Sequence, residues 1–199
     1  MSLKVTLADY GVGNLHSIRK ALENCGAKVE VVAEMRALLN AECIVLPGVG
    51  AFDKTMERLQ PYKEDLVKML LSGTPCLGIC IGMQIMFGSS EEGQQPGLGL
   101  LGGKVVRLKA DRVPHMGWNS VQSSDPIFKG LPSPYFYFAH SFHASPKEDV
   151  TIGTTEYYGR VPTLFKKANT YGTQFHPEKS SASGMVFLRN FITFAEEQL

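Results

Sequence analysis

The strongest constraint on the fold of this chain is the alternation of strand-like and helix-like segments in its first half. Short apolar runs typical of buried strands occupy residues 4–8, 29–33, 43–46 and 75–79. Helices are expected between or after these strands, at 15–25, where apolar residues have helical spacing, and at 61–71 and 81–87. Consecutive strands joined by helices run parallel, so the pattern predicts an α/β fold with an open, mostly parallel sheet and helices on both faces.

The second half is built differently. It holds short runs of β-branched and aromatic residues, separated by Gly, Pro, Asp and Ser, at 102–109, 117–122, 135–142, 151–157, 163–167 and 171–175. These runs are typical of antiparallel strands. A final helix is expected at about 183–196, and residues 91–103 form a long loop. No linker divides the chain, so we expect one domain over residues 1–199.

Composition excludes several classes of function. The chain has 199 residues and a net charge of +1, which argues against nucleic acid or an anionic membrane as its main partner. No apolar run approaches the ~18 residues of a membrane span. Asp9 interrupts the N-terminal region where a signal peptide needs apolar residues, and four cysteines without a CxxC pair favour reduced thiols. We therefore expect a cytoplasmic protein without a metal or another cofactor.

The segment Gly78-Ile79-Cys80-Ile81-Gly82 places a cysteine on a predicted strand-to-helix turn. Its serine counterpart, G-x-S-x-G, is the nucleophile elbow of hydrolases. Glycines on both sides allow a sharp turn that projects the nucleophile at the carboxyl end of the sheet, where open α/β sheets bind ligands. The start of the next helix favours a thiolate and offers the N–H of Ile81 to an oxyanion. The alternative is a buried cysteine on a glycine-bounded turn, the interpretation that we favour for Cys76.

A nucleophilic cysteine needs a base, and the chain has five histidines, at positions 16, 115, 140, 143 and 176. His176 follows an apolar strand and precedes Pro177 and Glu178. In an extended segment residues i and i+2 share a face, so Glu178 can orient the imidazole of His176. Taken alone, the segment is better explained as a polar turn after a strand. Together with the cysteine elbow, it favours a Cys-His-Glu catalytic site.

The two segments GICIGMQ and GTQFHPEKS resemble the class I glutamine amidotransferases, which have a flavodoxin-like fold. Residues 46–52, LPGVGAF, are similar to the glycine-rich oxyanion strand of that family. Residues 114–119, PHMGWN, together with DYGVGNLHS and YFYFAHSFH, are similar to the glutaminase subunits of imidazole glycerol phosphate synthases. The resemblance covers the whole chain. One departure is Phe142, where tyrosine is expected as often.

The resemblance implies a function and a set of site residues. Cys80 would attack the side-chain amide of glutamine, with His176 as acid and base and Glu178 as its orienter. The oxyanion would be held by the N–H of Ile81 and by an N–H from Val49 or Gly50. The remaining implied residues are, around the substrate, Gly48, Gly50, Gln84 and Ser141, and at a subunit interface, Asn14, Met116, Trp118 and Lys179.

The implied partner is a barrel-fold cyclase subunit, which would form a heterodimer with this chain and receive ammonia from it to make imidazole glycerol phosphate in histidine biosynthesis. Alternatives stay open. A class I glutaminase could serve another synthase, such as pyridoxal phosphate or anthranilate synthase. A cysteine-based redox or chaperone protein could share the fold, and a scaffold subunit could bind glutamine without turnover. A dinucleotide fingerprint at Gly11 and Gly13 is rejected, because His16 occupies the third glycine position.

Overall fold

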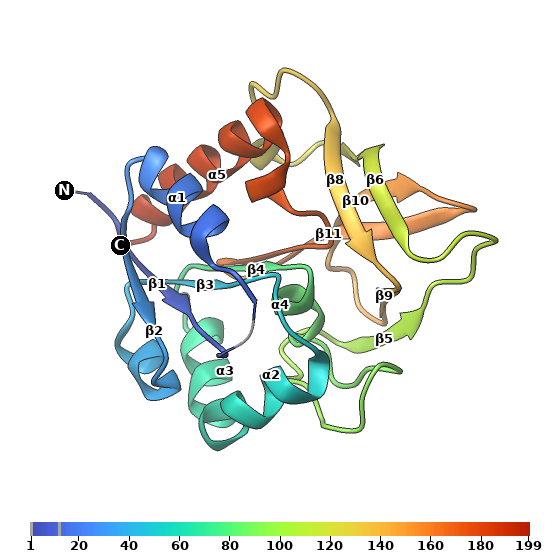
Figure 1. Ribbon diagram of the computed structural model, residues 1–199. Helices are drawn as coiled ribbons and strands as arrows, with labels where there is room; N and C mark the ends of the chain where they lie inside the picture. Colours follow the sequence, from blue (N-terminus) through green and yellow to red (C-terminus); the bar gives the residue numbers. More distant parts are fainter. Residues whose placement is uncertain (1, 12) are drawn as a thin grey trace.

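The computed structural model describes residues 2–11 and 13–199; Val12, between the two glycines of the rejected dinucleotide fingerprint, lies outside the described residues. An eight-stranded sheet forms the centre of the molecule, in the order β2-β1-β3-β4-β12-β11-β10-β7 (Figure 1). Its strands are β1 Lys4–Ala8, β2 Lys28–Val32, β3 Cys43–Leu46, β4 Cys76–Ile79, β7 Gln122–Ser123, β10 Thr151–Glu156, β11 Arg160–Lys167 and β12 Thr170–Thr173. The five strands from β2 to β12 are parallel and the rest antiparallel, as predicted.

Helices cover both faces of the sheet, which also confirms the prediction. α1 (His16–Asn24) and α5 (Ser181–Glu196) lie on one face, and α2 (Phe52–Leu59) and α3 (Lys63–Leu71) lie on the other (Figure 1). Each face has its own hydrophobic core, with Leu22 and Phe187 in one and Met56 and Leu66 in the other. The shorter helices are α4 Ile81–Gln84, η1 Met35–Asn40, η2 Gln60–Tyr62, η3 Pro126–Phe128 and η4 Pro177–Lys179.

Two antiparallel ribbons extend from the side of the sheet where the parallel strands end. One pairs β5 (Gly103–Arg107) with β9 (Phe142–Pro146), and the other pairs β6 (His115–Ser120) with β8 (Tyr135–His140) (Figure 1). The prediction of one strand over 135–142 was therefore wrong. The chain leaves β8 at Ser141, whose carbonyl accepts the N–H of Leu108 (2.9 Å), and then enters a different ribbon.

The sequence patterns above do not predict α2. Its buried residues Phe52, Thr55, Met56 and Leu59 have helical spacing, but residues 46–52 indicate only a glycine-rich oxyanion strand. Pro61 does not begin the next helix as predicted. It lies in the 3₁₀ turn η2, which separates α2 from α3. Within the described residues no helix is long and apolar enough to cross a membrane.

The register of the parallel strands brings three chain segments together. Leu46 at the end of β3 pairs with Gly78, and Ile79 at the end of β4 pairs with Thr173 at the end of β12. The residues that follow these three strands are therefore neighbours, although Cys80 and Gln174 are 94 positions apart in sequence. The edge where parallel strands end is the usual place for a ligand in open α/β sheets.

Candidate active site

Cys80 has the backbone conformation of a strained nucleophile elbow. Its φ is 47° and its ψ is −106°, a region that residues other than glycine rarely adopt. Hydrogen bonds hold it on both sides: its N–H donates to the carbonyl of Thr173 (2.6 Å), and its carbonyl accepts the N–H of Gln84 (2.9 Å). Such a conformation costs about 1–3 kcal/mol and persists only where its surroundings fix it. The strain supports the functional interpretation over an ordinary buried cysteine.

The two glycines of the elbow are required by close packing. A Cβ on Gly82 would overlap the backbone carbonyl of Leu46 at the end of β3. A Cβ on Gly78 would lie 2.5 Å from the methyl carbon of Met86 and 2.6 Å from the carbonyl oxygen of Gly82. The elbow helix α4 therefore packs directly on the strand ends. Ile81 is the first residue of that helix, so its N–H belongs to the donors that lack an intrahelical acceptor.

His176 and Glu178 form a buried ion pair. Nδ1 of His176 lies 2.8 Å from Oε1 of Glu178, and both side chains are more than nine-tenths buried. The predicted extended geometry was wrong in one respect. His176 is extended, with φ −102° and ψ 95°, but Pro177 to Lys179 form the 3₁₀ turn η4. Pro177 keeps His176 out of the helical region and starts the turn that brings Glu178 back to the imidazole.

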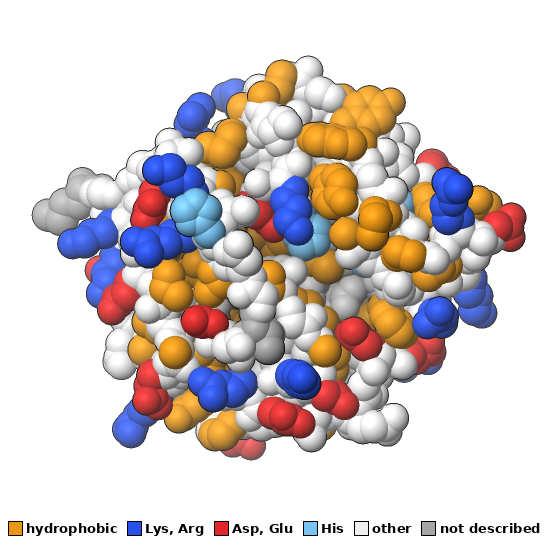
Figure 2. All heavy atoms as spheres, viewed as in Figure 1, with side chains coloured by type: hydrophobic (Ala, Val, Ile, Leu, Met, Phe, Trp, Pro, Cys, Tyr) orange, Lys and Arg blue, Asp and Glu red, His pale blue; other side chains and the backbone are white. Residues whose placement is uncertain are grey.

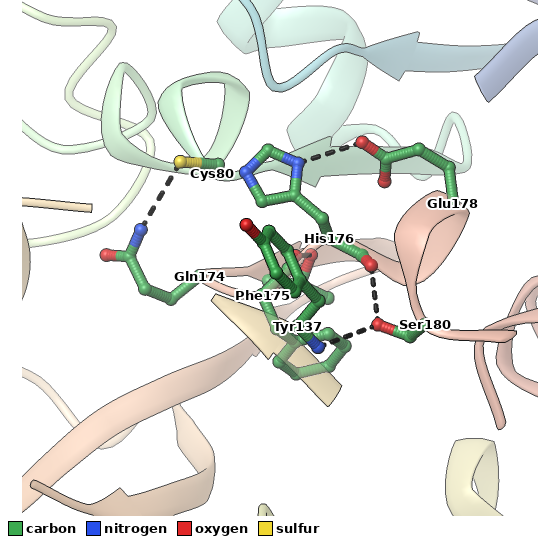
Figure 3. A network of polar contacts seen from close by, with 8 residues as sticks. Cys80, Tyr137, Gln174, Phe175, His176, Glu178 and Ser180 are labelled. Atoms are coloured by element: carbon green, nitrogen blue, oxygen red, sulfur yellow. Dashed lines mark hydrogen bonds and ion pairs between the residues drawn. The ribbon is translucent and has the colours of Figure 1, made fainter. Parts of the chain in front are cut away.

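The pair sets the protonation state of the imidazole. Burial lowers the pKa of His176, but the neighbouring Cys80 sulfur and the Glu178 carboxylate outweigh it and raise that pKa to about 10. In Figure 3 the imidazole lies between the sulfur and the carboxylate. At neutral pH the site therefore holds an imidazolium beside Cys80. Neither Cys43 nor Cys76 has such a neighbour, and burial raises the pKa of both thiols.

The backbone of His176 is fixed by a small hydrogen-bond network that the sequence patterns do not predict (Figure 3). The His176 N–H donates to the carbonyl of Tyr137 (2.9 Å). The hydroxyl of Ser180 donates to the carbonyl of His176 (2.6 Å) and accepts the N–H of Tyr137 (2.9 Å). Ser180 thus joins η4 to strand β8 and holds the base against the β6–β8 ribbon.

A cavity of about 300 Å³ opens at Cys80. Its lining residues are Gly48, Gly50, Cys80, Ile81, Gln84, Glu92, Ala139, His140, Ser141, Phe142, His176 and Lys179. All four residues predicted to surround the substrate are among them. Gly48 approaches closely, since a Cβ there would lie 2.8 Å from Cε1 of His176. Val49 is not part of the lining, because its side chain packs against Gly13.

His140 lines the cavity but is not available as a base for Cys80. Its Nδ1 lies 2.9 Å from the carbonyl of Phe142, and its Nε2 lies 3.1 Å from Nδ1 of His115. The carbonyl can only accept, so His140 donates through Nδ1 and accepts through Nε2. Burial lowers the pKa of His140 to about 3 and that of His115 to about 4, so both rings are neutral at pH 7. His16 is exposed on α1, and His143 lies on β9 outside the cavity lining, with its Nδ1 3.1 Å from the carbonyl oxygen of Ala144, so His176 remains as the base.

Of the four residues predicted at a subunit interface, only Lys179 borders the cavity at Cys80. Trp118 and Met116 are 53% and 66% exposed on β6, so a core position for the tryptophan is excluded. Hydrophobic side chains gather over this ribbon in Figure 2. Asn14 is exposed and accepts the N–H of His16 (2.8 Å). Lys179 is exposed and also borders the cavity, so it joins the surface to the site.

Three polar residues at the site were not predicted from the sequence. Gln174 is fully buried beside Cys80, Glu92 borders the cavity from the long loop after α4, and Ser180 anchors His176. Gln174 had a readable signal, because it stands two positions before His176 on an extended segment and shares its face. No sequence pattern points to Glu92, because the path of a loop of that length cannot be predicted from the sequence.

Comparison with known proteins agrees with this geometry. The family model described as "Glutamine amidotransferase class-I" matches residues 6–194. The chain belongs to the class-I glutamine amidotransferase family. Within it, the chain is 45% identical to "Imidazole glycerol phosphate synthase subunit HisH" of Methanocaldococcus jannaschii, over 94% of this chain and 98% of the relative. It is 41% identical to the protein of the same name from Thermosynechococcus vestitus, over 97% and 98%.

Solved structures confirm the fold alone. A glutamine amidotransferase crystal structure matches with a TM-score of 0.76 and 18% identity, over 96% of this chain and 98% of that chain. A chain of the PurLQS structure from Thermotoga maritima matches with a TM-score of 0.68 and 19% identity, over 95% and 97%. The resemblance to class I glutamine amidotransferases deduced from the elbow and the His-Pro-Glu segment is confirmed by the family model and by the relatives above.

Proposed function

We propose that this chain is the glutaminase subunit of an imidazole glycerol phosphate synthase and hydrolyses glutamine to glutamate and ammonia. The observation that carries the chemistry is the Cys80 elbow beside the buried His176–Glu178 pair, at the mouth of one small cavity. The particular member of the family is supported by identities of 41–45% over nearly the full length of relatives that bear that name.

The first half of the reaction forms a thioester. The Cys80 thiolate attacks the side-chain amide carbon of glutamine, and the carbonyl oxygen becomes an oxyanion. The N–H of Ile81 and an N–H from Val49 or Gly50 would hold that charge; each such donor is worth about 3 kcal/mol of barrier in measured cases. The C–N bond then breaks as the His176 imidazolium gives its proton to the leaving nitrogen, and ammonia departs.

The second half hydrolyses the thioester. His176 is now neutral and takes a proton from water, which attacks the thioester carbon. Collapse of the second oxyanion breaks the C–S bond, releases glutamate and restores the thiolate beside the imidazolium. Glu178 holds the imidazole in one tautomer through both steps and stabilises its charged form.

The cavity supports recognition of a free amino acid. Glycine backbone at positions 48 and 50 allows close approach of the ligand, while Ser141 and Phe142 border it from the β8–β9 junction. Glu92 places a carboxylate at the same cavity, and a carboxylate there suits the α-ammonium group of glutamine.

The partner would be a cyclase subunit with a barrel fold. It would bind the surface around Trp118 and Met116 on β6, and we expect contacts at Asn14 and Lys179 as well. The exposed aromatic residue on β6 supports this placement, because tryptophan and methionine are enriched in interfaces. The β6–β8 ribbon also connects that surface to His176. Trp118 pairs with Tyr137 across β6 and β8, and the carbonyl of Tyr137 accepts the N–H of His176. A partner on the ribbon would therefore be linked to the base through Tyr137 of β8.

The test is glutamate release from glutamine by the chain alone, and with the cyclase and its nucleotide ligand, using Cys80→Ala as the blank. We expect strong release only in the full mixture and none from the variant. Release by the isolated chain that the cyclase does not change would keep the cysteine mechanism and point to another synthase. No release in any mixture would contradict the proposal. A redox protein would instead retain Cys80 oxidation after His176→Ala.

A further inference from the structure

Gln174 is a buried polar residue that the mechanism above does not use. Its side chain is fully buried, where an amide is costly unless it is hydrogen-bonded. Oε1 accepts a hydrogen bond from Nε2 of Gln84 (3.2 Å), and Nε2 lies 3.6 Å from Sγ of Cys80, a hydrogen-bonding distance for sulfur. Figure 3 shows the amide aimed at the sulfur from the side opposite Glu178. Gln174 therefore contacts both the nucleophile and a residue of the substrate cavity.

The direction of these hydrogen bonds is fixed by a backbone carbonyl. Nε2 of Gln84 lies 2.9 Å from the carbonyl oxygen of Phe142, which can only accept. Gln84 must therefore present its NH₂ group there, and its second hydrogen reaches Gln174. Gln174 must then present its oxygen to Gln84, which leaves its own NH₂ group facing the sulfur. Gln84 therefore donates to Gln174, and Gln174 donates to Cys80. Turning either amide around would leave a buried polar group without a hydrogen-bond partner.

The same hydrogen bonds decide which atom of Gln84 remains for a ligand. Both hydrogens of its NH₂ group are used, so Oε1 is the atom left free. Within the described residues Oε1 of Gln84 has no hydrogen-bond donor. Gln84 borders the cavity, as does the carboxylate of Glu92. The cavity therefore presents two acceptors to the α-ammonium end of an amino acid.

We propose that Gln174 is a positioning residue that directs an N–H onto the Cys80 thiolate and locks Gln84 with its oxygen toward the substrate ammonium group. The hydrogen bond to Cys80 concerns the nucleophile alone. The orientation of Gln84 toward a substrate ammonium group rests on the proposed glutaminase function. Gln174 acts through Cys80 and Gln84 and touches no reacting atom of the substrate.

Two substitutions separate the two contacts. Gln174→Glu keeps an oxygen to accept from Gln84 and removes the N–H toward the sulfur. Gln174→Met has a similar length and removes both. Thr170→Val is the matched control, because Thr170 lies on the preceding strand β12, is 2% exposed, and its hydroxyl has no partner among the described residues.

The primary measurement is the rate of Cys80 alkylation by iodoacetamide as a function of pH, without glutamine. Peptide mass mapping separates Cys80 from Cys25, the one cysteine that is only partly buried. In both Gln174 variants we expect the pH at which the alkylation rate is half-maximal to rise by about one unit. This is the effect expected from the loss of one hydrogen bond to a charged group. Thr170→Val should leave it unchanged. An unchanged midpoint in both Gln174 variants would overturn the proposal.

The secondary measurement is steady-state glutamate release in the full mixture with the cyclase. Gln174→Met should raise KM for glutamine by about tenfold or more, while Gln174→Glu should lower kcat and leave KM within about threefold. Equal KM values in the two variants would refute the role in locking Gln84. If the wild-type chain releases no glutamate, the proposed function is wrong. The alkylation experiment would still test whether Gln174 donates a hydrogen bond to Cys80.

A spectroscopic measurement covers the case in which neither variant folds. In the wild-type chain with ¹⁵N-labelled glutamine residues, a buried side-chain amide should shift as pH passes through the alkylation midpoint. The same amide should not shift in Cys80→Ala. Absence of any such shift in the wild-type chain would count against the hydrogen bond to the sulfur.

Discussion

Replacing Glu178 by glutamine tests the central electrostatic claim about the site. The substitution preserves shape and removes a negative charge that lies 2.8 Å from Nδ1 of His176, in a pair that is almost completely buried. The carboxylate is one of the two groups that raise the pKa of His176 to about 10; the other is Cys80. Glu178→Gln should therefore lower the pKa of His176 toward its ordinary value.

The magnitude follows from the pKa. A net rise from about 6.5 to about 10 corresponds to roughly 5 kcal/mol of preference for the imidazolium in the folded protein, which Cys80 and Glu178 provide together against the opposing effect of burial. A buried charge-assisted hydrogen bond contributes about 1.5–3 kcal/mol of such a total. We assign about 2 kcal/mol to Glu178. The same loss in the transition state would lower kcat by roughly 30-fold.

The effect on stability has a defined pH dependence. A pKa that is raised by folding adds stability that is complete below the unfolded value, about 6.5, and is lost as pH rises through the folded value, about 10. The free energy of unfolding should therefore fall by about 2 kcal/mol at pH 6 in Glu178→Gln. At pH 10.5, where the imidazole is neutral in both proteins, this contribution should vanish.

The assay is urea denaturation of both proteins between pH 6 and 10.5, beside glutamate release in the full mixture. Glu30→Gln is the control, because Glu30 pairs with Lys4 at 2.8 Å but both side chains are about half exposed. A surface pair of this kind contributes about 0–1 kcal/mol. Equal destabilisation by Glu178→Gln at pH 6 and pH 10.5 would refute the assignment of the charge on His176.

Three further substitutions test other parts of the structure. Gly82→Ala forces a Cβ into the backbone carbonyl of Leu46, so we expect glutaminase activity to be lost and the thermal midpoint to fall by several degrees, measured by calorimetry. Asp53→Ala removes the carboxylate that accepts the N–H groups of residues 94 and 95 (2.9 Å), so limited proteolysis should cut that loop several times faster. Trp118→Ala should weaken binding of the cyclase by about tenfold or more in titration calorimetry and leave Cys80 alkylation unchanged.

Much of the fold can be predicted from local patterns. The strands predicted at 4–8 and 43–46 have those bounds in the structure, because buried parallel strands are short apolar runs between turn residues. The break at Ser141 could not be seen, since Phe142 resumes the aromatic pattern of residues 135–138 directly after it. What ends β8 is the carbonyl of Ser141, which accepts the N–H of Leu108 from another part of the chain.

The candidate site, like the fold, can be predicted only in part from local sequence patterns. The glycines around Cys80 predicted a tight turn, and the structure gives the physical need for one of them in the backbone of β3. Spacing alone could suggest the contact between His176 and Glu178 but not its 3₁₀ geometry. Glu92 could not be found, because only the folded loop carries it to the cavity.

The sequence by itself determined the local chemistry: a cysteine on a turn that only small neighbours permit, and a histidine held out of the helical region by the proline that follows it. Tertiary structure alone decided that these belong to one site. Strand β12 pairs with β4, which lies far from it in sequence, and this register sets Thr173 beside Ile79. Strand pairing depends on how two helix layers pack over the whole sheet, so no local pattern encodes it. From that pairing follow the neighbours of Cys80, with His176 and Gln174 among them.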